Sequence, residues 1–249
     1  MKQWYKTKQL TKYVYAIAEF NHWEKVISYL LLDSRRAFLI DTGMGYGNID
    51  KEIKKITHLP VKVLLTHAHW DHIGGAHRYN AVSLFDDAFE KSLLKKGFHS
   101  EDISELQDAS YFYSSYPKQY IVPGVKKFIS LKDGQTVKSN EFDIHVLHTP
   151  GHTPGSVCYY VPKFAYLFTG DTVYPGPIYL QLPESSWQQY QISINKLSSL
   201  NEQKLMLFPG HNNTTAPGSL IKELSRLVIS IHSSQEEVKG KHVSLLLKN

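Results

Sequence analysis

The feature that most constrains this chain is a run of metal-binding side chains directly after a short apolar segment. Residues 61–65 are apolar enough for a buried strand, and they lead into the motif His67-x-His69-x-Asp71-His72. Neutral imidazole and carboxylate groups are good zinc ligands, but four of them in one loop are costly to desolvate without a cation. The motif therefore predicts a metal site at the end of a strand.

Three later segments repeat this arrangement, in which an apolar strand is followed by glycine and a side chain that can bind metal. Residues 142–147 lead towards His152, residues 165–168 towards Asp171, and residues 205–208 towards His211. Glycine permits the sharp turns that aim such side chains into a shared cleft. One histidine after one strand is usually structural, whereas this recurrence favours a site built from four segments.

Hydrophobic periodicity predicts alternating strands and helices along the chain. Strands are expected at 13–20, 26–33, 37–40, 61–65, 142–147, 156–161, 165–168 and 205–208. Helices are expected at 49–56, 86–95, 187–197 and 220–231, the third behind a capping box of Ser186 and Gln189. Two sheets covered by helices satisfy this order, and no linker divides the chain. We therefore expect one α/β domain over residues 1–249.

The motif His67-x-His69-x-Asp71-His72, followed in order by His152, Asp171 and His211, resembles the metallo-β-lactamase superfamily. The resemblance runs from about Tyr13 to about Ile231 and implies a four-layer αββα sandwich with the metals at one edge. It implies one metal ion on His67, His69 and His152, a second on Asp71, His72 and His211, and Asp171 bridging both. It further implies that Asp41 supports a ligand histidine from behind.

The resemblance also implies a cofactor and a mechanism. Histidine at position 69 favours two zinc ions, because the diiron branch usually has an acidic residue there, and manganese and iron stay open. A hydroxide bridging the two ions would attack a carbonyl. Asp71 is expected to orient this nucleophile and to pass a proton to the leaving group. No protein nucleophile is required, and Cys158, in an apolar run, is interpreted as a buried hydrophobe.

The substrate class follows from details of the resemblance. A bridging aspartate, here Asp171, is usually absent from true β-lactamases, which favours the branch of glyoxalase II, lactonases and thioesterases. Glyoxalase II has a helical domain after the last ligand, whereas 38 residues, 212–249, follow His211. Lactonases place a tyrosine where Tyr174 stands, and its hydroxyl is expected either to contact a substrate carbonyl or to pack. Residues 167–174, 182–185 and 209–212 resemble acyl-CoA thioesterases, so a thioester is the first expectation.

Two other classes of function stay open, namely a phosphodiesterase, nuclease or β-lactamase-like hydrolase and a non-catalytic metal-binding protein. The net charge of +5 comes from scattered basic residues, which predicts no nucleic-acid groove and favours a small-molecule substrate. No apolar run has the length of a membrane span, and residues 1–6 do not resemble a secretory signal. A cytoplasmic protein with no membrane partner is therefore expected, and its oligomeric state is left open.

An aromatic insertion is expected near residues 100–122, where the side chains at 111–120 include Tyr111, Phe112, Tyr113, Tyr116 and Tyr120. We interpret this cluster as a lid or pocket wall, with Trp23 and Trp70 contributing to the same apolar mouth. Core packing or a dimer contact is the alternative interpretation.

Overall fold

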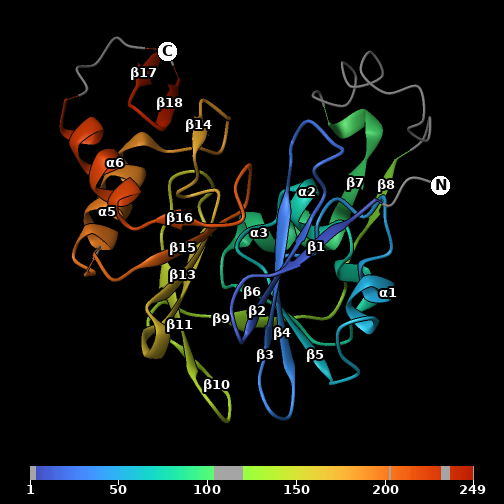
Figure 1. The fold of residues 1–249 in the computed structure, drawn as a ribbon. Helices are drawn as coiled ribbons and strands as arrows, with labels where there is room; N and C mark the ends of the chain where they lie inside the picture. Colours follow the sequence, from blue (N-terminus) through green and yellow to red (C-terminus); the bar gives the residue numbers. More distant parts are fainter. Residues whose placement is uncertain (1–3, 104–119, 202, 231–235, 249) are drawn as a thin grey trace.

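Two large sheets pack face to face, and helices cover the outer face of each sheet (Figure 1). The computed structural model describes residues 4–103, 120–201, 203–230 and 236–248. Within this part of the chain the layers follow the order helix, sheet, sheet, helix, as the sequence predicted.

The first sheet has the strand order β1-β2-β3-β4-β5-β6-β9. Its members are β1 (Lys6–Gln9), β2 (Val14–Ala18), β3 (Ile27–Leu32), β4 (Ala37–Ile40), β5 (Val61–Leu64), β6 (Val82–Phe85) and β9 (Ile129–Leu131). The strands from β4 to β9 run parallel, so each connection must cross over the sheet. These crossovers contain α1 (Ile49–Lys54), α2 (Trp70–Ile73) and α3 (Ala88–Lys96), which form the first helical layer.

The second sheet has the order β10-β11-β12-β13-β15-β16. Its members are β10 (Thr136–Lys138), β11 (Asp143–His148), β12 (Val157–Val161), β13 (Tyr166–Gly170), β15 (Met206–Pro209) and β16 (Ala216–Pro217). β13 and β15 are parallel, and the connection between them contains α5 (Trp187–Ser198). α6 (Ser219–Ser230) packs beside α5 and completes the outer layer (Figure 1).

Two small sheets lie outside this frame. One consists of β14 (Gly176–Leu180), β18 (Val243–Leu247) and β17 (Glu237–Lys239), and the other of β7 (Gly97–His99) and β8 (Ile121–Pro123). In the three-stranded sheet, β14 pairs in parallel with β18, so a strand near the chain's end is anchored beside the segment that follows Asp171.

The core consists of three apolar clusters, one between each pair of adjacent layers. Side chains alternate across each strand, so Leu30 packs in the first cluster, whereas Tyr29 and Leu31 pack between the sheets. On β13, Leu167 contacts the layer of α5 and α6, and Phe168 faces the other sheet. Both sheets are thus buried on both faces, which explains the continuous apolar runs in the sequence.

The predicted helices and strands agree with this fold to within a few residues at their ends. Ser186 caps α5 by accepting a hydrogen bond from the backbone N of Gln189, which is one half of the predicted capping box. The backbone N of Ser186 donates to Gly151 O instead of to the Gln189 side chain. Most of the predicted aromatic insertion, including Tyr111, Phe112, Tyr113 and Tyr116, lies outside the described residues. Over the described ranges, no helix is both long and apolar enough to cross a bilayer.

Candidate metal centre

The predicted ligands lie where strands of the two sheets end at one common edge. Residues 66–72 follow β5, and Asp171 and His211 follow β13 and β15. His152 comes from the loop between β11 and β12. Backbone hydrogen bonds join the sheets here, among them one from Ile27 N to Gly210 O at 2.7 Å and one from Val157 N to Thr66 O at 2.9 Å. The parallel pairs β4–β5 and β13–β15 explain this meeting point, because the carboxyl ends of parallel strands share an edge.

Two glycines permit the close approach of these segments. Gly170 has φ +47°, and a Cβ there would lie 2.6 Å from Thr66 Oγ1. A Cβ on Gly210 would lie 2.7 Å from Asp171 Oδ1. Any larger residue at either position would therefore displace a site side chain or strain the backbone.

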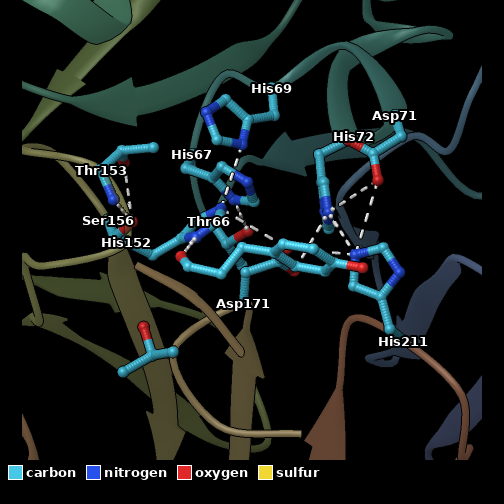
Figure 2. Close-up of polar contacts among 12 residues, drawn as sticks. Thr66, His67, His69, Asp71, His72, His152, Thr153, Ser156, Asp171 and His211 are labelled. Carbon is cyan, nitrogen blue, oxygen red and sulfur yellow. Dashed lines mark hydrogen bonds and ion pairs between the residues drawn. The ribbon is translucent and has the colours of Figure 1, made fainter. Parts of the chain in front are cut away.

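Seven side chains converge on one small space (Figure 2), namely His67, His69, Asp71, His72, His152, Asp171 and His211. Three groups of them have ligand atoms within 4.8 Å of one another: His67, His69 and His152; His67, His72 and Asp171; and Asp71, His72 and His211. The first and third groups match the two ligand sets that the family resemblance implied.

The Asp171 carboxylate lies between these two sets. Its Oδ2 is 3.5 Å from His152 Nε2 and 3.1 Å from His211 Nε2. Its Oδ1 is 3.2 Å from His72 Nε2. Asp171 therefore faces members of both sets, which is the placement expected of a bridging ligand.

Each of the five histidines has one ring nitrogen engaged by a partner outside this space. The pairs are His67 Nδ1 with Thr66 Oγ1 at 3.0 Å, His69 Nε2 with Glu184 Oε1 at 2.9 Å, His72 Nδ1 with Asp41 Oδ2 at 2.9 Å, His152 Nδ1 with Tyr179 O at 2.8 Å, and His211 Nδ1 with Glu24 O at 2.7 Å. Carbonyl and carboxylate oxygens only accept, so the engaged nitrogen must carry the proton. The opposite nitrogen then offers a lone pair to the shared space, which is Nδ1 for His69 and Nε2 for the others.

Asp41 positions two of these histidines, His72 by direct contact and His67 through the Thr66 hydroxyl. Its carboxylate accepts hydrogen bonds from Thr66 N at 2.7 Å and from Thr66 Oγ1 at 2.8 Å, and it faces His72 Nδ1. Because the Thr66 hydroxyl donates to Asp41, it accepts from His67. The contact of Asp41 with His72 is the one expected of a residue that supports a ligand histidine. Asp41 has φ +57°, and such strain in a non-glycine residue is typical of functional sites.

Two acidic residues to which the sequence analysis gave no role contact the site loops, namely Glu90 and Glu184, the second from the segment 182–185 noted above. Glu90 of α3 is buried and accepts hydrogen bonds from Ala68 N at 2.6 Å, from Gly155 N at 3.1 Å and from the Thr153 hydroxyl. Glu184 faces His69, and its neighbour Ser185 donates to His152 O at 2.8 Å. A single glutamate in a helix or loop carries no local signal of these long-range contacts.

Burial and carboxylates divide the histidines into two electrostatic groups. Burial holds the pKa of His67 well below its ordinary value and, with neighbouring His69, lowers the pKa of His152 to about 4. Burial opposes charge on His211 as well, but Asp171 outweighs it and raises the pKa of His211 to about 9. The carboxylates of Asp71 and Asp171 likewise raise the pKa of His72 well above its usual value despite its burial. Burial opposes charge on His69 too, but Glu184 outweighs it and raises the pKa of His69. Positive charge is thus favoured at His69, His72 and His211, and disfavoured at His67 and His152.

The donor set fits divalent metal ions. His67 Nε2 is buried and has no hydrogen-bond partner within the described part of the chain. His69 Nδ1 and His152 Nε2 are 3.0 Å apart, and His72 Nε2 and His211 Nε2 are 3.2 Å apart. Two ligand atoms on one tetrahedral zinc ion lie about 3.3–3.4 Å apart, given zinc–ligand bonds of about 2.0–2.1 Å. Facing lone pairs at such separations repel each other unless a proton or a cation lies between them.

A cavity of about 210 Å³ opens onto these ligands. Trp23 and Trp70 line it, as predicted for an apolar mouth, together with Tyr174, Tyr179 and Leu182. The buried Tyr174 hydroxyl donates to Pro177 O, which favours a packing role for Tyr174 over the predicted contact with a substrate carbonyl.

Two residues from the sequence predictions belong to the core. Tyr120 is buried, stacks on Tyr46 at a centroid distance of 4.4 Å and donates its hydroxyl to Met44 O. Cys158 is fully buried, and burial raises the pKa of its thiol to about 11. Neither residue lines the cavity at the ligands.

Comparison with known proteins agrees with this geometry. The sequence profile described as "Metallo-beta-lactamase superfamily" matches residues 23–211. The human protein named "Acyl-coenzyme A thioesterase MBLAC2" is 27% identical over 246 residues, covering 91% of this chain and 88% of that protein. The Haemophilus influenzae protein named "Hydroxyacylglutathione hydrolase GloC" is 28% identical over 198 residues, covering 75% and 84%. A solved metallo-beta-lactamase from Pontibacter korlensis has a TM-score of 0.67 at 18% identity, covering 91% of this chain and all of that one.

The fold and the convergent histidine and aspartate side chains thus define a metallo-hydrolase of the αββα type. The chain belongs to the metallo-beta-lactamase superfamily, and its family and relatives support hydrolase activity. The predicted family and fold class are confirmed.

Proposed function

We propose that this chain is a dinuclear zinc hydrolase that cleaves thioesters. The observation that carries the proposal is the arrangement of the five histidines, each fixed at one ring nitrogen and open at the other towards Asp71 and Asp171. His67, His69 and His152 would hold one ion, Asp71, His72 and His211 the other, and Asp171 would bridge them. Such an outer set of hydrogen bonds is typical of metal-binding histidines, whose unengaged nitrogen is the ligand.

Bound zinc ions would supply Lewis acidity, which makes water nucleophilic near neutral pH and polarises a carbonyl. The chain's own part is to orient the reactants and to move a proton. Asp71 Oδ2 lies 3.5 Å from both His72 Nε2 and His211 Nε2, at the cavity wall. From there the Asp71 carboxylate would orient the attacking water, accept its proton and return it to the leaving sulfur. The net reaction turns a thioester and water into a carboxylic acid and a thiol.

The choice of a thioester rests on two supports. Acyl-coenzyme A and hydroxyacylglutathione, which appear in the names of two relatives, are both thioesters. The indole rings of Trp23 and Trp70 also line the cavity and would accommodate the apolar part of an acyl group.

A substrate panel on the zinc-loaded protein tests this proposal. It should contain thioesters, lactones, oxygen esters, β-lactams and phosphodiesters, with Asp71→Asn as the comparison variant. We expect thioesters to give the highest kcat/KM, and Asp71→Asn to lower kcat about 100-fold or more, as for a lost acid–base group. Turnover of phosphodiesters alone would contradict the substrate class. Unchanged turnover in Asp71→Asn would contradict the proposed role of Asp71.

A further inference from the structure

A second cavity, of about 620 Å³, lies beside the metal-centre cavity. Its lining comes from α6, β16, the turn at residues 241–242 and the neighbouring segments at Pro175 and Asn213. None of the predicted site residues lines it. A cavity of this size is within the range of small-molecule sites.

A thin wall separates the two cavities. Tyr174 and Asn212 line the metal-centre cavity, whereas the next residues along the chain, Pro175 and Asn213, line the second one. Asn212 Nδ2 donates to Pro175 O at 2.8 Å, which joins the two segments of the wall. A molecule bound at the metal centre therefore has the second cavity as its immediate neighbour.

The second cavity carries an excess of positive charge. Lys222 and Arg226 lie one turn apart on α6, and Lys241 lies on the adjacent turn. Among the described residues, none of these three side chains forms an ion pair with a carboxylate. Glu223, the acidic lining residue, is already engaged, because it accepts from His242 N at 2.7 Å and faces His242 Nδ1 at 2.9 Å.

We propose that this cavity binds the phosphate-bearing nucleotide end of the thioester substrate, and the inference rests on the thioesterase function proposed above. Arginine and lysine suit phosphate oxygens, and the apolar floor of Ala216, Pro217 and Leu220 suits the face of a base. Ser219 begins α6 and also lines the cavity, so the positive end of the helix dipole adds to the field. The leaving-group thiol is thus a nucleotide-bearing one of the coenzyme A type.

Charge reversal at Lys222, Arg226 and Lys241, each to Glu, tests the inference with two thioesters of the same acyl group. One thioester is built on coenzyme A, and the other on N-acetylcysteamine, which has the same reacting end and no phosphate. Each exposed charge contact changes binding affinity by a factor of about 1.4–5. For the variant that lacks three such contacts we expect kcat/KM of the coenzyme A ester to fall about tenfold, because KM rises while kcat stays the same. For the N-acetylcysteamine ester we expect kcat/KM to stay within about twofold, because it makes no such contact. Arg226→Gln should also lower kcat/KM for the coenzyme A ester more than for the N-acetylcysteamine ester, but by a smaller factor.

The matched control reverses the exposed Lys51, Lys126 and Lys127, on the side of the first sheet, with the same change in net charge. Adenosine 3′,5′-bisphosphate should inhibit the native protein competitively, and the Lys222, Arg226 and Lys241 variant more weakly. Equal effects on both thioesters, or no effect on either, would overturn the nucleotide site while leaving the thioesterase proposal intact. If the native protein hydrolyses neither thioester, the proposed function fails, whereas calorimetric titration with the bisphosphate still decides whether the cavity binds it.

Discussion

At the residue scale, each of the five histidines has one hydrogen-bond partner that decides which of its ring nitrogens faces the candidate metal centre. The partners are of three kinds: the carboxylates of Asp41 and Glu184, the hydroxyl of Thr66, and backbone carbonyl groups. The carbonyl partners do not depend on side-chain identity, whereas Asp41, Glu184 and Thr66 act through side chains that a substitution can remove. These three residues are therefore the informative positions for mutagenesis.

Glu184→Ala should weaken zinc binding about 10- to 100-fold, because loss of such an outer hydrogen bond frees the ligand ring. Glu184→Gln should lose less, since its amide oxygen still accepts from His69 Nε2. Glu24→Ala is the matched control, because it keeps the backbone carbonyl that accepts from His211. Competition with a chromophoric chelator measures the affinities. Equal losses in Glu184→Ala and Glu24→Ala would contradict the positioning role of Glu184.

At the scale of elements, α3 holds two ligand loops that are far apart in the sequence. Its Glu90 accepts from Ala68 in the loop after β5 and from Thr153 and Gly155 in the loop before β12. Burial raises the pKa of the Glu90 carboxyl, and these donors and His69 offset the rise only partly. The helix thus ties together the two loops that carry His69 and His152.

Glu90→Ala should lower the free energy of unfolding by about 2 kcal/mol or more, since it leaves the buried Ala68 N and Gly155 N unpaired at about 1–3 kcal/mol each. The Thr153 hydroxyl still faces Ser156 Oγ at 2.7 Å. Ser92→Ala, at an exposed position of the same helix, should change stability by less than about 0.5 kcal/mol. Urea unfolding followed by circular dichroism measures both. A Glu90→Ala loss no larger than that of Ser92→Ala would show that this helix is not an anchor.

The helices and strands that could be predicted are those whose hydrophobic pattern is contained within the element itself. β4 is a continuous apolar run and β5 is an apolar run interrupted by Lys62, and their bounds were predicted to within one residue. β6 is as buried as they are but was not predicted, because its four residues lie between polar segments that showed no clear periodicity. β14 and β18 pair across more than sixty positions of sequence, and such pairing leaves no mark in either strand alone.

The candidate site residues with a local sequence pattern could also be predicted, whereas those that act through long-range contacts could not. The spacing of the motif predicted His67, His69, Asp71 and His72, and the repeated position after a strand predicted His152, Asp171 and His211. Glu90 and Glu184 act across 22 and 115 positions, so their partners are visible only in the folded chain. The hydrogen bond from Tyr174 to Pro177 O, which favours packing, likewise depends on the turn into β14.

At the scale of the whole molecule, the candidate metal centre joins the two halves of the sandwich. Each proposed ligand set takes residues from the loop after β5 in the first sheet and one histidine, His152 or His211, from the second. Bound ions would therefore link the sheets at one edge, where the hydrogen bonds from Ile27 to Gly210 and from Val157 to Thr66 already join them. Metal binding and stability should be coupled.

Removal of zinc by a chelator should therefore lower the Tm. A ligand present at 100 times its Kd stabilises the native state by about 2.7 kcal/mol. For a chain of this length, about 1 kcal/mol corresponds to about 2–4 °C, so we expect a decrease on the order of 5–10 °C. Calorimetry with and without chelator measures the change, and the His152→Ala variant should show a smaller one. An unchanged Tm after verified removal of zinc would contradict the coupling.

The number of zinc ions bound per chain tests the central claim most directly. Purified protein is dialysed against zinc, separated from unbound metal by gel filtration and analysed by mass spectrometry for metal content. The proposed ligand sets predict two ions per chain in the native protein. They predict a clear loss when His67, His152 and His211 are all replaced by alanine. A native protein without bound zinc, or an unchanged zinc content in the triple variant, would contradict the assignment of these side chains as metal ligands.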